Sequence, residues 1–180
     1  AMFYNDKESS LVSYMDEVIA IFTNVHHDIK TADYYYRKLQ QMADAHNQDE
    51  MEELEKIGSR LRLLKNIYAQ MDSLENVRTS LPMSSYEWGL TSLRKANLLI
   101  RIQRIDEGTK ICEQIYDMSV NLRNDPEKLH WYVLRNLSNY CIVKQYYDRA
   151  RKYLNEQLSW LDSQSVPFEY EERGWVYNKL

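Results

Sequence analysis

YEWGLTSLRKANLLIRIQ, residues 86–103, is the most informative stretch of this 180-residue sequence. Its apolar residues recur at helical spacing and cover most of the helix circumference: Leu90, Leu93, Ala96, Leu98, Leu99, Ile100 and Ile102. A helix that is apolar on most sides is buried on most sides, as the inner helix of a central unit should be. A polar turn at 106–108 then leads to a partner helix with one clean apolar stripe, which comprises Ile111, Ile115, Met118 and Leu122. The stretch therefore predicts a packed pair of helices.

Similar helix–turn–helix units recur along the chain with a period of about forty residues. Aligned on their apolar positions, the units start near Asp16, Met51, Gly89 and Trp131. Within each unit, apolar residues at i, i+3, i+4 and i+7 mark one helix, and the pattern resumes after a short polar break. Units of this kind bury their apolar faces against neighbouring units, which is typical of an α-solenoid. Since glycine and proline are also few, 4 and 3 residues, we predict an all-α fold.

Turn and capping signals divide the chain, which we treat as a single helical domain over 1–180 and as a fragment of a longer protein. We place the units near 9–48, 49–82, 83–124 and 125–165, with 166–180 as the start of a further, truncated helix. Three motifs predict where helices start. Two are capping boxes, Asp49 with Glu52 and Ser84 with Glu87, and the third is an N-cap followed by proline, Asp125 with Pro126. Residues 49–80 allow two interpretations, a helix pair with a turn at Lys65-Asn66 or one long helix.

Charge and cysteine content narrow the functional classes. A net charge of −4 and a pI near 5.6 argue against direct nucleic-acid binding, because nucleic-acid-binding modules are usually basic. No apolar run approaches the roughly 18 residues that span a membrane. The two cysteines, Cys112 and Cys141, lack the spacing of metal ligands, and we predict that both are buried thiols. We expect a cytoplasmic region without a cofactor, although export of the parent protein is compatible with the sequence.

A family resemblance is carried by small and aromatic residues at fixed places in the units. The last unit has the best match, YYDRARKY at 146–153, and fits the pattern at Leu134, Leu137, Ser138, Cys141, Tyr147, Ala150 and Leu154. The third unit offers small residues, Ala96 and Gly108, where paired helices cross closely. These features resemble the tetratricopeptide repeat family. The resemblance implies a right-handed α–α superhelix of about four helix pairs plus the truncated terminal helix.

The resemblance is degenerate. The units are longer than the family's repeat of about 34 residues. The first unit scarcely matches, because it has Thr23 and Tyr35 where small residues belong. An irregular helical bundle that shares only the amphipathic pattern is the alternative.

The resemblance also implies a function. Divergent repeats with long helices and abundant tyrosine look like the sensor or partner-binding regions of bacterial transcription regulators, whose DNA-binding segment lies outside the repeats. It therefore implies a non-catalytic module that binds a protein or peptide. The alternative is a self-association scaffold, with Trp175 and the last helix packing on another copy as a homodimer.

In tetratricopeptide arrays the first helix of each pair lines the binding groove. The resemblance places three asparagines at one equivalent groove position, and Ser59 takes that place in the second unit. An asparagine amide offers two donors and one acceptor, which matches the edge of an extended peptide backbone. Arginine adds charge-assisted bonds to a carboxylate, and tyrosine a stacking surface. The predicted partner-binding residues are Asn24, Asn97, Arg101, Tyr132, Arg135 and Asn139. Asparagines that bond between helices or to water are the alternative.

Motifs for catalysis or metal binding are weak. His26 and His27 are adjacent, so on a helix they point about 100° apart and cannot easily share an ion. Glu127 and His130 form one Glu-x-x-His, whereas di-iron bundles need two such motifs and further glutamates. No nucleophile elbow or glycine-rich phosphate loop is present. We therefore predict no metal site and no enzymatic activity. Two tyrosine clusters, 34–36 and 146–147, pack between helices or form an exposed aromatic patch.

Overall fold

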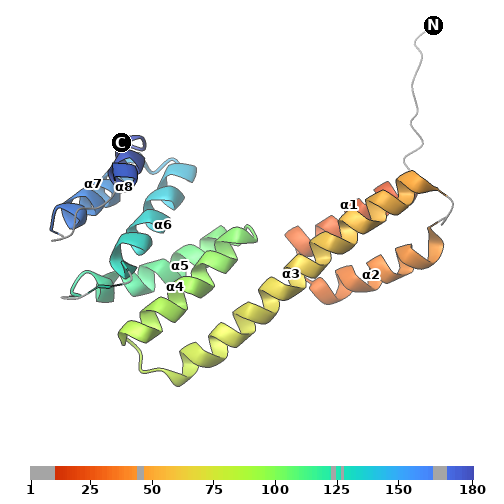
Figure 1. The fold of residues 1–180 in the computed structure, drawn as a ribbon, viewed down its shortest axis with the longest axis horizontal. Coiled ribbons are helices and arrows are strands. Elements are labelled where there is room, and N and C mark those ends of the chain that lie inside the picture. The colour runs from red at the N-terminus through yellow and green to blue at the C-terminus, as the bar shows by residue number, and fades with distance from the viewer. Residues whose placement is uncertain (1–10, 44–46, 123–124, 127, 164–169) are drawn as a thin grey trace, which may run out of the picture. The chain divides into compact units, whose positions relative to one another are not determined.

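The computed structural model describes residues 11–43, 47–122, 125–126, 128–163 and 170–180. These residues contain eight helices and no strand, which confirms the predicted all-α class (Figure 1). The chain divides into two units, residues 1–70 and 71–180, and each has its own hydrophobic core. Neighbouring helices pack as hairpins, an arrangement compatible with a helical repeat.

The first unit contains α1 (Leu11–Asn24), α2 (Ile29–Met42) and the N-terminal part of α3 (Gln48–Ser80). Its fully or nearly fully buried apolar residues come from all three helices: Val12, Ile19, Ala32, Leu39, Leu54, Ile57 and Leu61. Asp28 caps α2, since its carboxylate accepts the backbone N–H of Thr31 at 3.0 Å. Ion pairs from Arg60 to Asp16 and from Lys65 to Asp33 add links from α3 to the other two helices.

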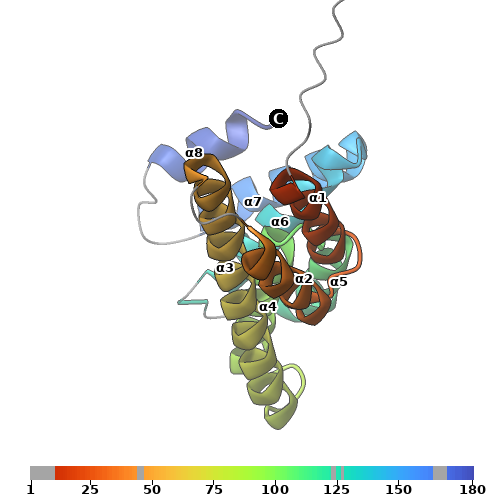
Figure 2. The ribbon, with the colours of Figure 1, turned by 90° about the vertical axis from the view of Figure 1, so that its right-hand side faces the viewer.

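Residues 48–80 form one helix of 33 residues, so the single-helix interpretation is correct (Figure 2). Lys65 and Asn66, the candidate turn, are exposed surface positions of the continuing helix, and Ile67 beside them is buried. A polar pair on the solvent side of a helix gives the same local pattern as a turn. Without glycine or proline at this point, nothing breaks the hydrogen-bond ladder.

The second unit contains the end of α3 and five further helices: α4 (Tyr86–Arg101), α5 (Ile105–Ser119), α6 (Leu129–Val143), α7 (Tyr147–Ser163) and α8 (Tyr170–Tyr177). α4 pairs with α5 and α6 with α7, while α5 and α4 also contact α6, and α8 packs on α7 (Figure 1). The first helices of the two hairpins, α4 and α6, are therefore neighbours. The core between the hairpins comprises Trp88, Leu93, Ala96, Cys112, Ile115, Leu129, Val133 and Leu137.

The predicted close crossing of α4 and α5 lies at Ala96 and Gly108. A Cβ atom on Gly108 would lie 2.8 Å from the carbonyl oxygen of Ala96 and 2.7 Å from Cγ1 of Ile100. Only a residue without a side chain fits this approach. The two small positions inferred from the repeat pattern therefore meet in space.

Helix starts differ from the predicted caps by one to several residues. Asn47 and Ser85, rather than Asp49 and Ser84, accept the capping N–H bonds of α3 and α4. Asp125 is bonded to the N–H groups of Leu129 and His130, at 2.6 and 2.8 Å, so α6 begins after the predicted Pro126 start. Asp125 also accepts the hydroxyl of Tyr86 at 2.8 Å, which ties the α5–α6 connection to α4.

The last turns of α3 are held to α4 by a carboxylate with two basic partners. Glu75 accepts hydrogen bonds from Arg78 at 2.6 and 2.8 Å and from Lys95 at 2.9 Å. These bonds lower the pKa of Glu75 to about 2. Arg78 in turn lies over the Trp88 ring, 5.9 Å from its centroid. The carboxylate is therefore charged under all ordinary conditions and fixes the start of the second unit.

Candidate functional site

One face of α6 is polar and partly exposed. Tyr132, Arg135, Asn136 and Asn139 follow one another at the i, i+3, i+4, i+7 spacing, which places them on one side of a helix. The opposite side is buried and comprises Val133, Leu134, Leu137, Ser138 and Cys141. The polar side borders α4 through Asn136 and α8 through Arg135, and the rest of it is open to solvent or a partner.

The neighbouring helix α4 adds Asn97 and Arg101, which are exposed and one helical turn apart. Nδ2 of Asn136 donates to Oδ1 of Asn97 at 2.8 Å, so the two helices are joined by an amide–amide hydrogen bond. For Asn97, this is the bond between helices that the alternative interpretation of the asparagines expects. The same Nδ2 lies 3.6 Å from Sγ of Cys112, within the distance of a weak bond to sulfur. We call the surface formed by Asn97, Arg101, Tyr132, Arg135, Asn136 and Asn139 the first-helix face.

The Asn97–Asn136 pair leaves complementary groups unused. Once Asn136 donates to Asn97, the amide NH₂ of Asn97 and the carbonyl oxygen of Asn136 remain. A donor and an acceptor on adjacent helices match the C=O and N–H groups that alternate along an extended peptide. The pair is therefore chemically suited to a backbone ligand.

Arg135 lies against two aromatic rings, and among the described residues no carboxylate is paired with it. Its guanidinium carbon lies 5.5 Å from the centroid of Trp131 and 4.9 Å from that of Trp175 in α8. Tyr132 contacts the same Trp131 ring edge-on, with centroids 5.1 Å apart. Trp131 is 2% exposed, so this aromatic group is anchored in the core. Trp175, which the self-association hypothesis uses, is thus in contact with residues of its own unit.

The predicted residues are divided between the two units. Asn97, Arg101, Tyr132, Arg135 and Asn139 lie on α4 and α6 of the second unit. Asn24 is the last residue of α1 in the first unit, where its Oδ1 accepts the Thr23 hydroxyl at 3.3 Å. The sequence interpretation missed Asn136, although its separation from Asn97, 39 residues, is close to the repeat period and was the available signal.

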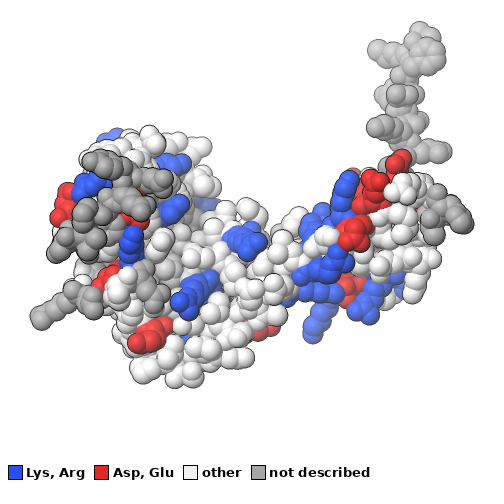
Figure 3. All heavy atoms as spheres, in the orientation of Figure 1, with Lys and Arg blue, Asp and Glu red and all other residues white. Residues whose placement is uncertain are grey.

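Basic side chains are common on the surface of the second unit. In the orientation of Figure 3 they are spread over this unit, and acidic side chains lie mainly toward its margins. On the first-helix face itself, Arg101 and Arg135 have no carboxylate within ion-pair distance among the residues that the structure describes. The face therefore presents positive charge even though the whole chain carries −4.

A second polar cluster lies inside the unit, between α5, α6 and α7. Nδ1 of His130 is 2.9 Å from the hydroxyl oxygen of Ser119, and its Nε2 is 3.4 Å from Oε1 of Glu156. Tyr116 donates its hydroxyl to Glu156 at 2.8 Å. This order of groups resembles a Ser–His–carboxylate triad. However, Ser119 is 1% and His130 6% exposed, so no substrate reaches the hydroxyl unless the helices open.

The hydroxyl of Ser119 has two acceptors within reach, His130 Nδ1 and the backbone carbonyl of Tyr116 at 2.9 Å. With neutral His130, the hydroxyl donates to Nδ1 while Nε2–H points to Glu156. With protonated His130, Nδ1–H donates to the Ser119 oxygen and the hydroxyl turns to the Tyr116 carbonyl. Ser119 and His130 therefore keep their hydrogen bonds in both protonation states of His130. The cluster joins α5, α6 and α7.

We expect His130 to make stability pH-dependent. Burial lowers the pKa of His130 below its usual 6.5, and the nearby carboxylates of Glu156 and Asp125 act in the opposite direction without offsetting it. The unfolded chain then binds a proton first, so stability is complete above pH 6.5 and falls as the pH drops below it, by up to about 1.4 kcal/mol per pH unit. Urea unfolding of wild type and His130→Gln at pH 7.5 and 5.5 measures this, and the variant should show a smaller loss. If both proteins lost the same stability between pH 7.5 and 5.5, the pH dependence would come from groups other than His130.

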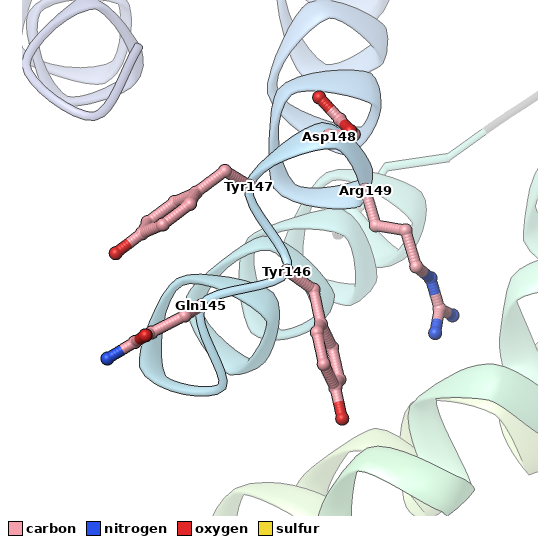
Figure 4. Close-up of a pocket in the computed structure, with 5 residues that line it drawn as sticks. All are labelled: Gln145, Tyr146, Tyr147, Asp148 and Arg149. Atoms are coloured by element: carbon pink, nitrogen blue, oxygen red, sulfur yellow. The ribbon is translucent and has the colours of Figure 1, made fainter.

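The α6–α7 turn carries a cavity of about 520 Å³ lined by residues 145–149 (Figure 4). Tyr146 and Arg149 point to one side of the turn and Tyr147 to the other. Tyr146 and Tyr147 are 50% and 64% exposed, so this tyrosine pair is an exposed aromatic patch rather than packing between helices. A single turn forms the lining, and no cluster of convergent charged groups accompanies it.

The described residues contain neither a metal-ligand cluster nor a membrane-spanning helix. Within the described residues, no group of three or more histidine, cysteine, aspartate or glutamate side chains is placed to hold a metal ion. Cys112 and Cys141 are buried free thiols, as expected. In the same part of the chain, no helix combines the length and the apolar character needed to cross a bilayer.

Comparison of the chain with models of known protein families, with curated proteins and with solved structures gives no match. The resemblance to tetratricopeptide repeats therefore rests on the residues themselves and on the packing of the helix hairpins.

Proposed function

We propose that the chain is a non-catalytic, tetratricopeptide-like module that binds a peptide or an extended segment of a protein on the first-helix face. The observation that carries the proposal is the hydrogen-bonded Asn97–Asn136 pair between α4 and α6. It presents one donor and one acceptor at the junction of two first helices, where an extended backbone can use both. As the resemblance implies, the module would serve as the sensor or regulatory region of a transcription regulator.

Preorganisation supports the proposal. The amide of Asn136 is oriented by Asn97 and Cys112, and the backbones of α4 and α6 are fixed by the core beneath them. A ligand therefore does not have to order these groups when it binds, which lowers the entropic cost of association. The Ala96–Gly108 crossing supports the repeat architecture, because close pairing of α4 with α5 is what the family pattern requires.

The test is a selection of random decapeptides on the immobilised chain, followed by affinity measurement for a selected peptide. We expect Asn136→Ala and Asn97→Ala each to weaken binding by about 3- to 10-fold, because each removes a hydrogen-bonding partner of the peptide backbone. Asn155→Ala is the matched control, since Asn155 is exposed on α7, away from the first-helix face. Selected peptides that bind all three variants with wild-type affinity, or a selection that yields no peptide, would contradict the proposal.

A further inference from the structure

We propose that the outer face of the α1–α2 hairpin, in the first unit, is an interface with a second copy of this chain. By outer face we mean the side of these two helices that points away from α3. The first-helix face and Trp175 both belong to the second unit, so this inference is independent of peptide binding and of self-association through α8.

The contacts with α3 show which side of the hairpin is the outer one. Asp16 of α1 and Asp33 of α2 form ion pairs with α3, so they lie on the inner side. Val25 and Met42 follow these two aspartates by nine residues each, about two and a half turns, and therefore lie on the opposite side. The backbone N–H of Val25 bonds to the carbonyl oxygen of Ile21 at 2.9 Å, so the helical geometry reaches this residue. Val25 is 66% and Met42 60% exposed, so the other helices of the unit leave this side open.

The outer face of α1 carries a stripe of apolar residues. They recur at alternating separations of three and four residues, the spacing of a helix that packs lengthwise against another helix: Leu11, Tyr14, Val18, Ile21 and Val25. Val18 is half-buried, and the other four are 43% to 66% exposed. On α2 the apolar surface continues through Tyr35, which stacks on Phe22 of α1 at 5.4 Å, to Met42 two turns further on. A contiguous exposed apolar surface of this kind marks an interaction site.

The charges beside the apolar stripe favour a second copy as the partner. α1 contains two acidic residues and no basic one, whereas α2 contains three basic residues and one acidic residue. A two-fold axis parallel to the helices places α1 of each copy over α2 of the other. Opposite charges then meet at two equivalent places, whereas packing of α1 on α1 would bring like charges together. The outer face is therefore complementary to itself.

This arrangement pairs Glu17 of each copy with Lys38 of the other. The stacked rings of Phe22 and Tyr35 put these two residues at one level of the hairpin. Glu17 precedes Phe22 by five residues, and Lys38 follows Tyr35 by three. Since the two helices are antiparallel, Glu17 and Lys38 lie on the same side of that level, within about 3 Å of each other along the helix axis. Both are exposed, and each lies within one turn of an apolar residue of the outer face.

The size of the outer face fits a weak dimer. Each of its helices has 14 residues. Such a helix is about 21 Å long, and two packed helices are together about 20 Å wide. Two faces of this size in contact bury on the order of 1,000 Å², which is at the low end for specific protein–protein interfaces. Both helices are already ordered by their own core, so association needs little further ordering, and we expect a dissociation constant in the micromolar range.

The experiment is sedimentation velocity on the 180-residue chain at concentrations from about 1 to 300 µM. The first variant is Ile21→Lys, which puts a charge into the apolar stripe. Glu17→Lys, Lys38→Glu and the double variant test the charge pairing. Val143→Lys is the matched control, because Val143 is a branched apolar residue, 65% exposed, on α6 of the second unit. Circular dichroism on each variant verifies that the helices are retained.

For wild type and Val143→Lys we expect a reversible equilibrium between monomer and dimer. Ile21→Lys should raise the dissociation constant about tenfold or more, because dimer formation would bury an unpaired charge. Glu17→Lys and Lys38→Glu should each raise it about 3- to 10-fold, because like charges then face each other. The double variant restores opposite charges and should return to within about twofold of wild type.

Three results would overturn the inference. A wild-type chain that stays monomeric up to about 300 µM would show that no second copy covers the outer face. A dimer that tolerates Ile21→Lys as well as it tolerates Val143→Lys would be formed by another surface. A double variant that dimerises no better than Glu17→Lys or Lys38→Glu alone would overturn the packing of α1 on α2.

Discussion

Replacing Trp131 by alanine is expected to lower the free energy of unfolding by about 3–5 kcal/mol, as removal of a buried tryptophan does in other cores. Trp131 is 2% exposed and contacts Tyr132, Arg135 and Trp175, so the substitution leaves a cavity between α6 and α8 and removes a support of the first-helix face. Denaturant unfolding followed by circular dichroism measures the change.

Tyr132→Ala is the control for this substitution, because Tyr132 is 39% exposed on the same helix and should cost about 1 kcal/mol or less. If the two variants were equally stable, Trp131 would not be the anchor of the aromatic group. Trp131 would then not be what positions Arg135.

Gly108→Val should destabilise the fold by about 2–3 kcal/mol, the upper part of the range for overpacking. The first added carbon would meet a backbone atom, the Ala96 carbonyl oxygen at 2.8 Å, so rotation of a side chain does not relieve the clash. The pairing of α4 with α5 would have to widen, and the junction with α6 would shift. Thermal or denaturant unfolding gives the magnitude.

Gly174→Ala is the matched control for Gly108→Val, since a Cβ atom there meets nothing within 4 Å in α8. Alanine at this helical position should leave stability unchanged or raise it by up to about 1 kcal/mol, through higher helix propensity. A Gly108→Val protein as stable as wild type would show that the crossing of α4 and α5 is looser than described.

The helices follow from local spacing, whereas their ends depend on groups that local spacing does not reveal. The apolar stripes at i, i+3, i+4 and i+7 predict the all-α class and the paired helices of the second unit. The predicted start of α6 at Pro126 was wrong. Asp125 accepts hydrogen bonds from the N–H groups of Leu129 and His130, so it caps the helix from several residues before its first turn. Exposed Lys65 and Asn66 gave the same polar pattern as a turn, so sequence alone left α3 open as one helix or two.

Part of the candidate site could also be predicted from the sequence, and part could not. The spacing of Tyr132, Arg135 and Asn139 places them on one side of a helix, and that much was predictable. The Asn97–Asn136 bond was not, because it depends on the register between α4 and α6, which a repeat alignment with uneven unit lengths misplaces by a few residues.

Contacts between residues of different helices could not be predicted from the sequence either, because they depend on how the helices are placed. The ring of Trp175 reaches Arg135 only through the placement of α8. The Ser119–His130–Glu156 cluster needs three helices to converge, and its members are distant in sequence.

The most direct test of the central claim is a titration of the ¹⁵N-labelled chain with a selected peptide, following the side-chain amide signals of asparagine by NMR. We expect the signals of Asn97 and Asn136 to move on binding, and the signal of Asn155 on α7 to stay in place. Movement confined to residues outside α4 and α6, with these two amides unchanged, would contradict it.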